Sequence, residues 1–301
     1  MEISAAASTV TEPSVSGSSF YVAMRLLPRQ QRRAMFAIYA FCRAVDDVAD
    51  GRGDRQARLD ELAHWRRDIE TLFAGMPASR VRALAEPIRS FELQREDFLS
   101  IIDGMEMDAR ADIRAPDLAT LDLYCDRVAC AVGRLSVRVF GIRGQDGVAL
   151  AFQLGRALQL TNILRDLDED AAKARLYLPR EALLAAGIGQ TDPATVLDHP
   201  ALGKACATVV ERARGHFAEA RRLMAQHPLR IVRAPWLMAK AYQNILERLA
   251  ARGWAAPRRP IRAGPTRPAG GLPPEASTRP ARAAPRFARP GRSSPAATGP
   301  H

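Results

Sequence analysis

The sequence predicts an all-α fold, and three observations support this prediction. Apolar residues recur at intervals of three and four over long segments, which is the period of an amphipathic helix. No segment keeps the period of two that a half-buried strand requires. Prolines and glycines separate the periodic segments. We therefore expect a bundle of long helices that point side chains into a central cavity.

The first long helix is expected over residues 29–50. Pro28 lies where a proline is tolerated at a helix start, and Met35, Ile38 and Cys42 follow at helical spacing. Further helices are expected at 54–73, 91–109, 117–140, 146–170, 200–225 and 234–252. The breaks between them are expected near Pro77, Pro87, Pro116, Gly141, Pro179 and Pro228.

The positive charge of the chain lies mostly at its C-terminal end. The 301 residues carry a formal net charge of +11, and residues 255–301 contain nine arginines against one acid, Glu275. Eleven of the 21 prolines also lie in this segment, with few large apolar residues between them. Such a segment cannot offset the entropy lost on ordering, so we expect a disordered tail. We expect a flexible N-terminus over 1–15 and one domain over 16–254.

An arginine-rich tail could bind nucleic acid or anionic lipid, or it could be a dispensable end of the chain. The tail is poor in the aromatic residues that stack on bases, and it lacks the amphipathic period that docks on membranes. These properties favour the dispensable end, and we expect no nucleic-acid partner.

The cysteines and the apolar runs indicate a cytoplasmic protein. The four cysteines form no CxxC pair and no disulfide framework of the kind found in small secreted domains. Residues 1–19 contain neither a basic segment nor an apolar segment typical of a signal peptide. No apolar run approaches the roughly 20 residues of a membrane-spanning helix, so any membrane contact is expected to be peripheral.

Two acidic motifs, far apart in the chain, suggest a site for divalent metal and diphosphate. The first contains Asp46, Asp47 and Asp50, and in the second Asn162, Asp166 and Asp170 follow each other at steps of four. Carboxylates four residues apart share one helix face and repel each other by about 0.2–0.5 kcal/mol per pair. Mg²⁺ prefers oxygen ligands and commonly bridges protein carboxylates to substrate phosphates. We therefore expect these residues to bind Mg²⁺.

The residues beside the acidic motifs suit an anionic substrate. Ser16, Ser18 and Ser19 precede the first helix, and Arg43 and Arg165 stand next to the two motifs. A guanidinium group pairs with phosphate through two hydrogen bonds. The alternative for the two arginines is intrahelical pairing with neighbouring acids, and both roles are compatible. For an acidic run alone, a solvated helix face would be the simpler interpretation.

Several blocks in one order resemble the squalene/phytoene synthase family, whose members join two isoprenyl diphosphates head to head. The resemblance covers about residues 16–259. The matching blocks are residues 16–21, 26–28 and 37–43 before the first motif, residues 103–108, residues 124–133, residues 159–170 and residues 175–179. Residues 126–127 and 133–141 look closest to the bacterial presqualene diphosphate synthases of hopanoid pathways.

The resemblance implies an isoprenoid-synthase-type helical bundle with several Mg²⁺ ions. Within it, two farnesyl diphosphates would condense to presqualene diphosphate, one diphosphate would be released, and no NADPH would be needed. The implied catalytic residues are Tyr124, Arg43 and Arg165. The implied metal ligands are Asp46, Asp47, Asp50, Asn162, Asp166 and Asp170, with Asp47 less directly engaged. The implied substrate-binding residues are Ser16, Ser18, Ser19, Phe20, Tyr39, Arg43, Gln159, Arg165, Arg175 and Tyr242.

Some alternatives stay open at this point. Phe20, Tyr39 and Tyr242 are equally compatible with core packing, because aromatic residues at helical spacing usually pack. The proton released during condensation could pass to the released diphosphate or to a phenol. Phytoene synthase or squalene synthase is the related enzyme alternative. The non-enzyme alternative is an all-α binding protein with a basic tail that binds nucleic acid.

Overall fold

The computed structural model describes residues 24–51, 54–110 and 113–261. Within these residues the secondary structure is helical, and the one β pairing is an isolated bridge between Arg114 and Leu176. The prediction of an all-α fold is confirmed. The long helices are α2 (Arg29–Ala49), α3 (Arg55–Phe73), α5 (Arg95–Arg110), α7 (Ala131–Phe140), α8 (Gly144–Arg165), α12 (Leu202–Met224) and α13 (Leu229–Arg252). The short ones are η1 (Ser79–Leu84), α4 (Ala85–Phe91), α6 (Leu118–Cys125), η2 (Asp126–Cys130), α9 (Leu167–Ala172), α10 (Arg180–Ala185) and α11 (Pro193–Leu197).

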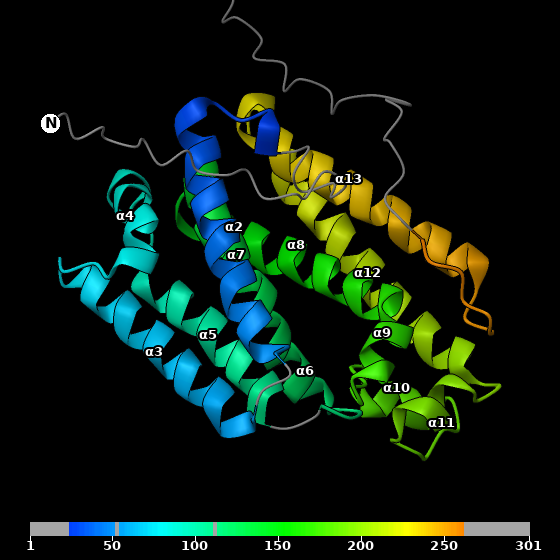
Figure 1. The fold of residues 1–301 in the computed structure, drawn as a ribbon. Helices are drawn as coiled ribbons and strands as arrows, with labels where there is room; N and C mark the ends of the chain where they lie inside the picture. Colours follow the sequence, from blue (N-terminus) through cyan, green and yellow to red (C-terminus); the bar gives the residue numbers. More distant parts are fainter. Residues whose placement is uncertain (1–23, 52–53, 111–112, 262–301) are drawn as a thin grey trace, which may run out of the picture.

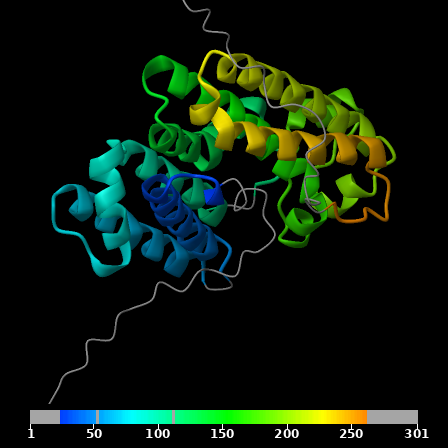
Figure 2. The ribbon, with the colours of Figure 1, turned by 90° about the horizontal axis from the view of Figure 1, so that it is seen from above.

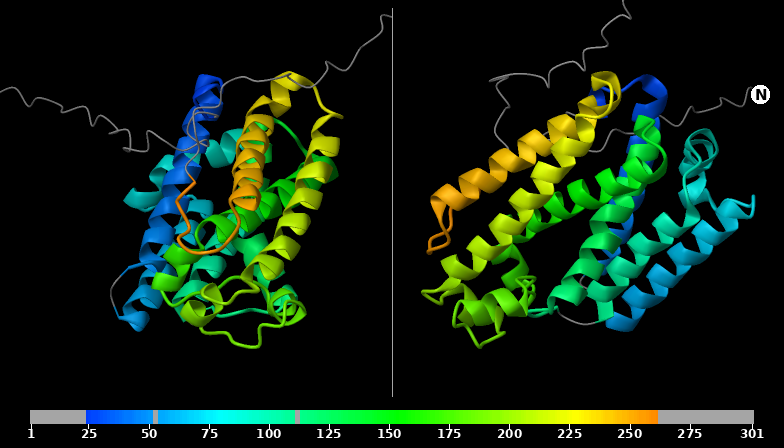
Figure 3. Two further views of the ribbon diagram at one scale, coloured as in Figure 1. Left: turned by 90° about the vertical axis from the view of Figure 1, so that its right-hand side faces the viewer. Right: turned by 180° about the vertical axis from the view of Figure 1, so that it is seen from behind.

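Helix α8 crosses the middle of the molecule and separates two groups of helices (Figure 1). It contacts α7, α12 and α13, while α2, α3 and α5 contact one another on the other side. Figure 2 shows these two groups side by side, seen from above. In both views of Figure 3, α12 and α13 lie alongside each other. The buried apolar residues form two clusters that follow this division. The space between the two groups contains the cavity described below.

Two predicted helices are interrupted in the structure. The helix predicted over 146–170 ends at Arg165, and α9 begins at Leu167 with Asp166 at the junction. The helix predicted over 117–140 contains a π-helical turn, η2, between α6 and α7. A π turn inside a helix is frequent at functional sites because it redirects the side chains on either side. Both interruptions lie beside the cavity, so they affect how side chains enter it.

Other predicted boundaries were wrong. Pro87 was expected to break a helix, but it lies in the first turn of α4, where the missing N–H costs no hydrogen bond. Pro235 lies inside α13, which begins five residues earlier than expected because Pro228 serves as its N-cap. The short helices η1, α10 and α11 were not predicted because five or six residues give no readable period.

Two glycines allow the helices around η2 to approach closely. A Cβ atom added at Gly155 of α8 would lie 2.9 Å from the backbone of Cys130. A Cβ atom added at Gly104 of α5 would lie 2.5 Å from the side chain of Val128. Real Cβ atoms do not tolerate such contacts, so glycine is required for η2 to sit between α5 and α8. This packing fixes the central wall of the cavity.

The first residues of the predicted tail contact the folded core. Ile261 is partly buried against the apolar cluster that contains Trp254, the last residue of the predicted domain, and Arg258 hydrogen-bonds to Asp168. The rest of the predicted tail, 262–301, and the predicted flexible N-terminus, 1–15, lie outside the described residues. Among the described helices, none combines the length and the apolar composition needed to cross a membrane.

Candidate active site

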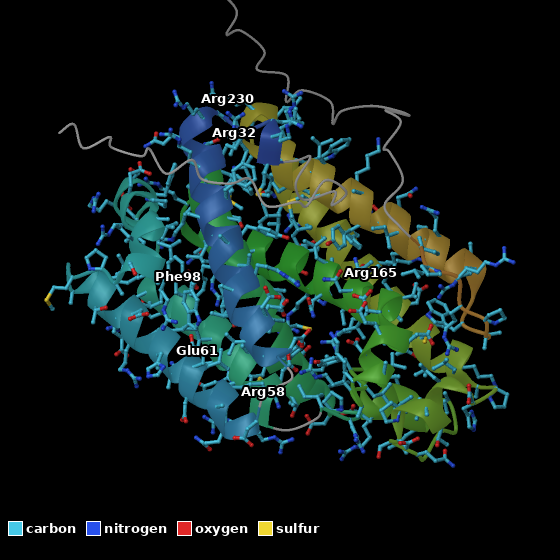
Figure 4. The ribbon with its side chains drawn as sticks, viewed as in Figure 1. Arg32, Arg58, Glu61, Phe98, Arg165 and Arg230 are labelled. Atoms are coloured by element: carbon cyan, nitrogen blue, oxygen red, sulfur yellow. The ribbon has the colours of Figure 1, made fainter. Side chains whose placement is uncertain are left out.

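A cavity of about 730 Å³ lies between the two helix groups. Its walls come from α2, α5, α6, η2, α7, α8, α9, the segment 173–177 and α13. Figure 4 labels Arg165, which lies near the C-terminal end of α8 at the centre of the molecule. Twelve of the residues predicted from the sequence line this cavity: Tyr39, Arg43, Asp46, Asp50, Tyr124, Gln159, Asn162, Arg165, Asp166, Asp170, Arg175 and Tyr242.

Five predicted residues are not brought to this cavity by the described structure. Asp47 is exposed on α2 and does not line it. This position agrees with the expectation that Asp47 is less directly engaged with metal than Asp46 and Asp50, and its role at the metal site stays a prediction. Ser16, Ser18, Ser19 and Phe20 lie outside the described residues, so their roles stay predictions.

The first acidic motif forms one wall of the cavity, near the end of α2. Arg43 contacts Asp46 at 3.1 Å and Asp47 at 2.8 Å, which are distances typical of salt bridges. Burial raises the pKa of Asp46 to about 6, and the negative charge of Asp50 adds to this effect. Asp46 is thus a partly desolvated carboxylate facing other carboxylates, which favours binding of a cation.

Asp50 is held by two cations from a distant part of the chain. Lys173 Nζ donates to one of its oxygens at 2.8 Å, and Arg175 Nη1 donates to the other at 2.7 Å. Burial alone would raise the pKa of Asp50, but the hydrogen bonds and charges of Lys173 and Arg175 lower it below its usual value. This pairing joins the end of α2 to the segment that follows α9.

The second acidic motif forms the opposite wall. Asp166 accepts hydrogen bonds from its neighbour Arg165 at 2.7 Å and 2.6 Å, a bidentate pair. Burial raises the pKa of Asp170 to about 7, and the charge of Asp166 adds to this effect. Although the helix is interrupted, Asp166 N–H donates to Asn162 C=O at 2.9 Å and Asp170 N–H donates to Asp166 C=O at 2.8 Å. The predicted stripe of three oxygen-bearing side chains is therefore preserved.

Asn162 has a buried oxygen without a partner. Its Nδ2 donates to Gln159 at 3.4 Å, but its Oδ1 accepts no hydrogen bond within the described residues. Leaving a buried acceptor unpaired costs about 1–3 kcal/mol, so such an atom requires an explanation. A cation bound at this wall would be one, because amide oxygens are ligands for hard cations.

The described residues contain no preassembled cluster of three or more His, Cys, Asp or Glu side chains with metal-binding geometry. The carboxylates instead make ion pairs with Arg43, Arg165, Lys173 and Arg175. The donor set still fits Mg²⁺, because it consists of carboxylate and amide oxygens. An anionic substrate would also fit, since the same four cations could bind it.

A buried network beside the polar end connects two tyrosines to one carboxylate. Tyr124 and Tyr177 donate to the two oxygens of Asp108 at 3.0 Å and 2.6 Å. Their rings stack with centroids 4.9 Å apart. Burial raises the pKa of Asp108, and burial also raises the pKa of Tyr124 well above its usual value. Tyr124 thus faces the cavity as a neutral phenol in a fixed orientation.

The polar lining residues that were missed as site residues include Asp108, Lys173 and Tyr177. Asp108 belongs to the matching block 103–108, but the sequence does not distinguish it from its acidic neighbours. The structure does, because Asp103 and Glu106 both contact Arg66 of α3 instead. Lys173 and Tyr177 stand next to Arg175, so their proximity to a predicted residue was the available signal.

The remainder of the cavity is mostly apolar. Met105, Val132, Phe140, Leu150, Leu154 and Met238 are among its lining residues. The cavity therefore has one end rich in carboxylates and cations and another suited to hydrocarbon. A substrate that combines diphosphate with a long apolar chain matches both ends.

Comparison with known proteins gives relatives over most of the chain. A presqualene diphosphate synthase of Rhodopseudomonas palustris is 59% identical over 248 residues, which is 82% of this chain and 89% of that protein. One from Sinorhizobium fredii is 55% identical, over 87% of this chain and 94% of that protein. A 15-cis-phytoene synthase of Synechocystis is 34% identical, over 78% of this chain and 74% of that protein.

Solved structures show the same fold. A squalene synthase, HpnC, from Alicyclobacillus acidocaldarius superposes with a TM-score of 0.72 at 30% identity, over 80% of this chain and 90% of that chain. A dehydrosqualene synthase superposes with a TM-score of 0.65 at 27% identity, over 77% and 82%. The family model for squalene/phytoene synthase matches residues 14–267. The chain therefore belongs to the squalene/phytoene synthase family.

Proposed function

We propose that this chain is a prenyltransferase that condenses two farnesyl diphosphates to presqualene diphosphate and releases one diphosphate. The observation that carries the proposal is the placement of both acidic motifs at one end of a cavity that is otherwise apolar. The relatives named presqualene diphosphate synthase, at 55–59% identity, support this substrate over a longer one.

The polar end is proposed to bind the two diphosphates. Arg43, Arg165, Lys173 and Arg175 would donate to phosphate oxygens, since guanidinium and ammonium groups form charge-assisted hydrogen bonds to them. The residues proposed to hold Mg²⁺ are Asp46, Asp50, Asn162, Asp166 and Asp170. When bound, the metal offsets the negative charge that develops on a departing diphosphate.

The apolar end is proposed to hold both prenyl chains and exclude water. Loss of diphosphate breaks a C–O bond and leaves an allylic cation, which the double bond of the second chain attacks to form a C–C bond. Water would quench the cation, so side chains such as Phe140, Leu154 and Met238 protect it by filling the cavity wall. The ring of Tyr124 can stabilise the positive charge through its face by about 0.5–2 kcal/mol.

The proton lost on closing the cyclopropane ring is proposed to pass to the released diphosphate. The alternative acceptor is a phenol such as Tyr124. Because burial raises the pKa of Tyr124 well above its usual value, its phenolate form is scarce near neutral pH. Tyr124 also donates its hydroxyl hydrogen to Asp108. We therefore assign Tyr124 to orientation and cation stabilisation.

One product assay tests the proposal. The purified chain would be incubated with Mg²⁺ and either farnesyl or geranylgeranyl diphosphate, with and without NADPH, and the products identified by mass spectrometry. We expect presqualene diphosphate from farnesyl diphosphate, in equal amounts with and without NADPH. Preferential conversion of geranylgeranyl diphosphate would instead indicate a phytoene synthase, and squalene formed with NADPH would indicate a squalene synthase.

Membrane contact is proposed to be peripheral, at the end of the molecule where α2 and α13 begin. Arg32 and Arg230 lie at this end (Figure 4), and exposed Arg25, Arg29 and Arg233 lie near them in the sequence. Positive charge attracts anionic lipid headgroups. Co-sedimentation with vesicles containing anionic lipid, compared with neutral vesicles, tests this, and equal binding to both would contradict it.

A further inference from the structure

Arg258, in the segment after α13, forms a salt bridge with Asp168 of the second acidic motif. Its Nε lies 2.9 Å and 3.0 Å from the two carboxylate oxygens of Asp168, and its Nη2 lies 2.6 Å from one of them. The Arg258 side chain is only 6% exposed, whereas that of Asp168 is 56% exposed. A guanidinium buried to this extent needs its carboxylate partner, because without it the buried positive charge would be uncompensated.

Asp168 points away from the cavity that its neighbours line. Asp166, Glu169 and Asp170 all line the cavity, and Asp168 does not. At 3.6 residues per helical turn, a residue two positions from Asp166 or Asp170 is rotated from each by about 200°. Asp168 is therefore on the outer face of α9, opposite the two proposed metal ligands.

Arg258 also connects α9 to two other parts of the fold. Its Nη1 donates to the carbonyl oxygen of Leu197 at 3.1 Å and to that of Trp254 at 3.0 Å. Leu197 is the last residue of α11, which contacts α9, and Trp254 is buried in the larger apolar cluster. One side chain thus joins α9, α11 and the end of the α13 segment.

Helix α9 needs such an anchor. It spans six residues, and α8 ends just before it, with Asp166 at the junction. Isolated helices of this length are unstable in water, because a single turn does not offset the cost of nucleation. The orientation of α9 therefore depends on tertiary contacts, and with it the directions of Asp166 and Asp170.

We propose that Asp168 and Arg258 are positioning residues, which clamp the outer face of α9 so that Asp166 and Asp170 stay directed into the cavity. The proposal rests on the proposed function, because it takes Asp166 and Asp170 to be metal ligands. It assigns a role to the first residues beyond α13, which the sequence alone favours as the start of a dispensable tail. Neither Asp168 nor Arg258 contacts substrate in this account.

Hydrogen exchange in the full-length chain, without metal or substrate, tests the clamp itself. We expect the amides of residues 167–173 to exchange faster in Asp168→Asn than in the wild type, while those of α12 are unchanged. Asp168→Asn is preferred to Arg258→Ala because it keeps the hydrogen bonds of Arg258 to Leu197 and Trp254. The control is Glu219→Gln, which removes another carboxylate bonded to an arginine, Arg222, on the surface of α12. Unchanged exchange at 167–173 would overturn the proposal.

A Mg²⁺ titration of activity tests the consequence for the site. Loss of a residue that orients a metal ligand typically weakens metal binding 10–100-fold, so we expect Asp168→Asn to raise the half-saturating Mg²⁺ concentration about tenfold. We expect kcat at saturating Mg²⁺ to stay within about threefold of wild type, because the ligands remain. Asp168→Glu, which keeps the carboxylate, should lie closer to wild type.

The outcomes separate this proposal from the proposed function. A lower kcat with an unchanged Mg²⁺ requirement would mean a merely structural role and would overturn the positioning proposal. If the wild-type chain converts no prenyl diphosphate, the proposed function fails. The exchange experiment would still decide whether Arg258 holds α9.

Discussion

The two walls of the cavity present acidic groups in different states of pairing. On the α2 wall, Asp46 and Asp47 share Arg43, and Asp50 is bound by Lys173 and Arg175. On the α8–α9 wall, Asp166 pairs with Arg165, but Asp170 forms no salt bridge within the described residues. The oxygen of Asn162 on that wall is buried and unpaired.

Under the proposed function, this difference predicts that metal binds the α8–α9 wall before the α2 wall. A metal ion would bind Asn162 and Asp170 without displacing a salt bridge, whereas at Asp50 it would compete with Lys173 and Arg175. Lys173 and Arg175 both line the cavity, so under the proposed function they would bind a diphosphate once metal replaces them at Asp50. The two walls are therefore coupled through the segment 173–175.

The largest expected effect distinguishes the proposed metal ligands from Asp47, the exposed acid of the first motif. Asp46→Ala and Asp166→Ala, one on each wall, are expected to lower kcat by at least about 10²–10³-fold, because each removes a charge that acts on the departing diphosphate. Asp47→Ala is expected to cost less than about fivefold, since Asp47 is exposed and its pairing with Arg43 is worth at most about 1 kcal/mol. Initial rates with farnesyl diphosphate measure this. An equal loss in Asp47→Ala would contradict the assignment.

The next effect concerns the network that lies between the walls. Asp108→Ala removes the acceptor of two buried hydroxyl groups, those of Tyr124 and Tyr177. Each unpaired group costs about 1–3 kcal/mol, so the free energy of unfolding is expected to fall by at least that amount. Urea denaturation measures it, with Asp47→Ala as the control expected to change little. A fall no larger than in the control would mean that the network does not stabilise the fold.

A smaller expected effect is a change of thermal stability with pH, caused by one carboxylate on each wall. Asp46 and Asp170 have pKa values raised to about 6 and about 7. Between about pH 4 and these values the folded chain binds more protons than the unfolded chain, so these groups reduce stability as the pH rises through that range. In EDTA, Asp170→Asn should therefore raise the Tm at pH 8 by about 2–4 °C, the shift that roughly 1 kcal/mol produces, and change it little at pH 4.5.

The α2 wall can be tested with the same comparison of Tm at pH 4.5 and pH 8. Asp46→Asn should show the same pattern as Asp170→Asn with a smaller amplitude, because the pKa of Asp46 is raised less. Thermal unfolding followed by circular dichroism at the two pH values measures both. Shifts of equal size at pH 4.5 and pH 8 would contradict the assignment of these pKa values.

The smallest expected effect lies in the segment that couples the walls. Ala174 has φ of 58°, a left-handed conformation that costs a residue with a Cβ about 1–2 kcal/mol. Ala174→Gly removes this strain but loses about 0.5–1 kcal/mol to the greater freedom of the unfolded chain, which leaves a gain of about 0–1.5 kcal/mol. The control, Ala172→Gly at the end of α9, should instead lose stability. Urea denaturation decides, and a loss in Ala174→Gly would contradict the account.

The sequence supports the prediction of the long helices and of most lining residues, because helical period and fixed spacing are local properties. The stripe of Asn162, Asp166 and Asp170 is such a case. The sequence does not predict the break between α8 and α9 at Asp166. That junction depends on contacts of α9 with α11 and with Arg258. The pairing of Asp50 with Lys173 and Arg175 spans more than 120 residues, so no local pattern contains it.

The identity of the buried acid is a second limit of sequence reasoning. The block 103–108 offers three acids at nearly equal spacing, and only packing directs Asp103 and Glu106 to Arg66 and Asp108 to the tyrosines. In the same way Asp47 shares the motif of Asp46 and Asp50 but lies on the exposed side of α2. Which member of an acidic run enters a cavity is decided by helix rotation, and that is set by tertiary contacts.

The central claim is that the two walls act together on one pair of diphosphates. A crystal soaked with Mn²⁺ and a non-hydrolysable farnesyl thiolodiphosphate, examined by anomalous scattering, tests it most directly. We predict metal peaks within coordination distance of Asp46 or Asp50 and of Asn162, Asp166 or Asp170, with diphosphate oxygens between them. We also predict that Lys173 and Arg175 contact diphosphate. Metal confined to one wall, with Asp50 still bound to Lys173 and Arg175, would contradict the claim.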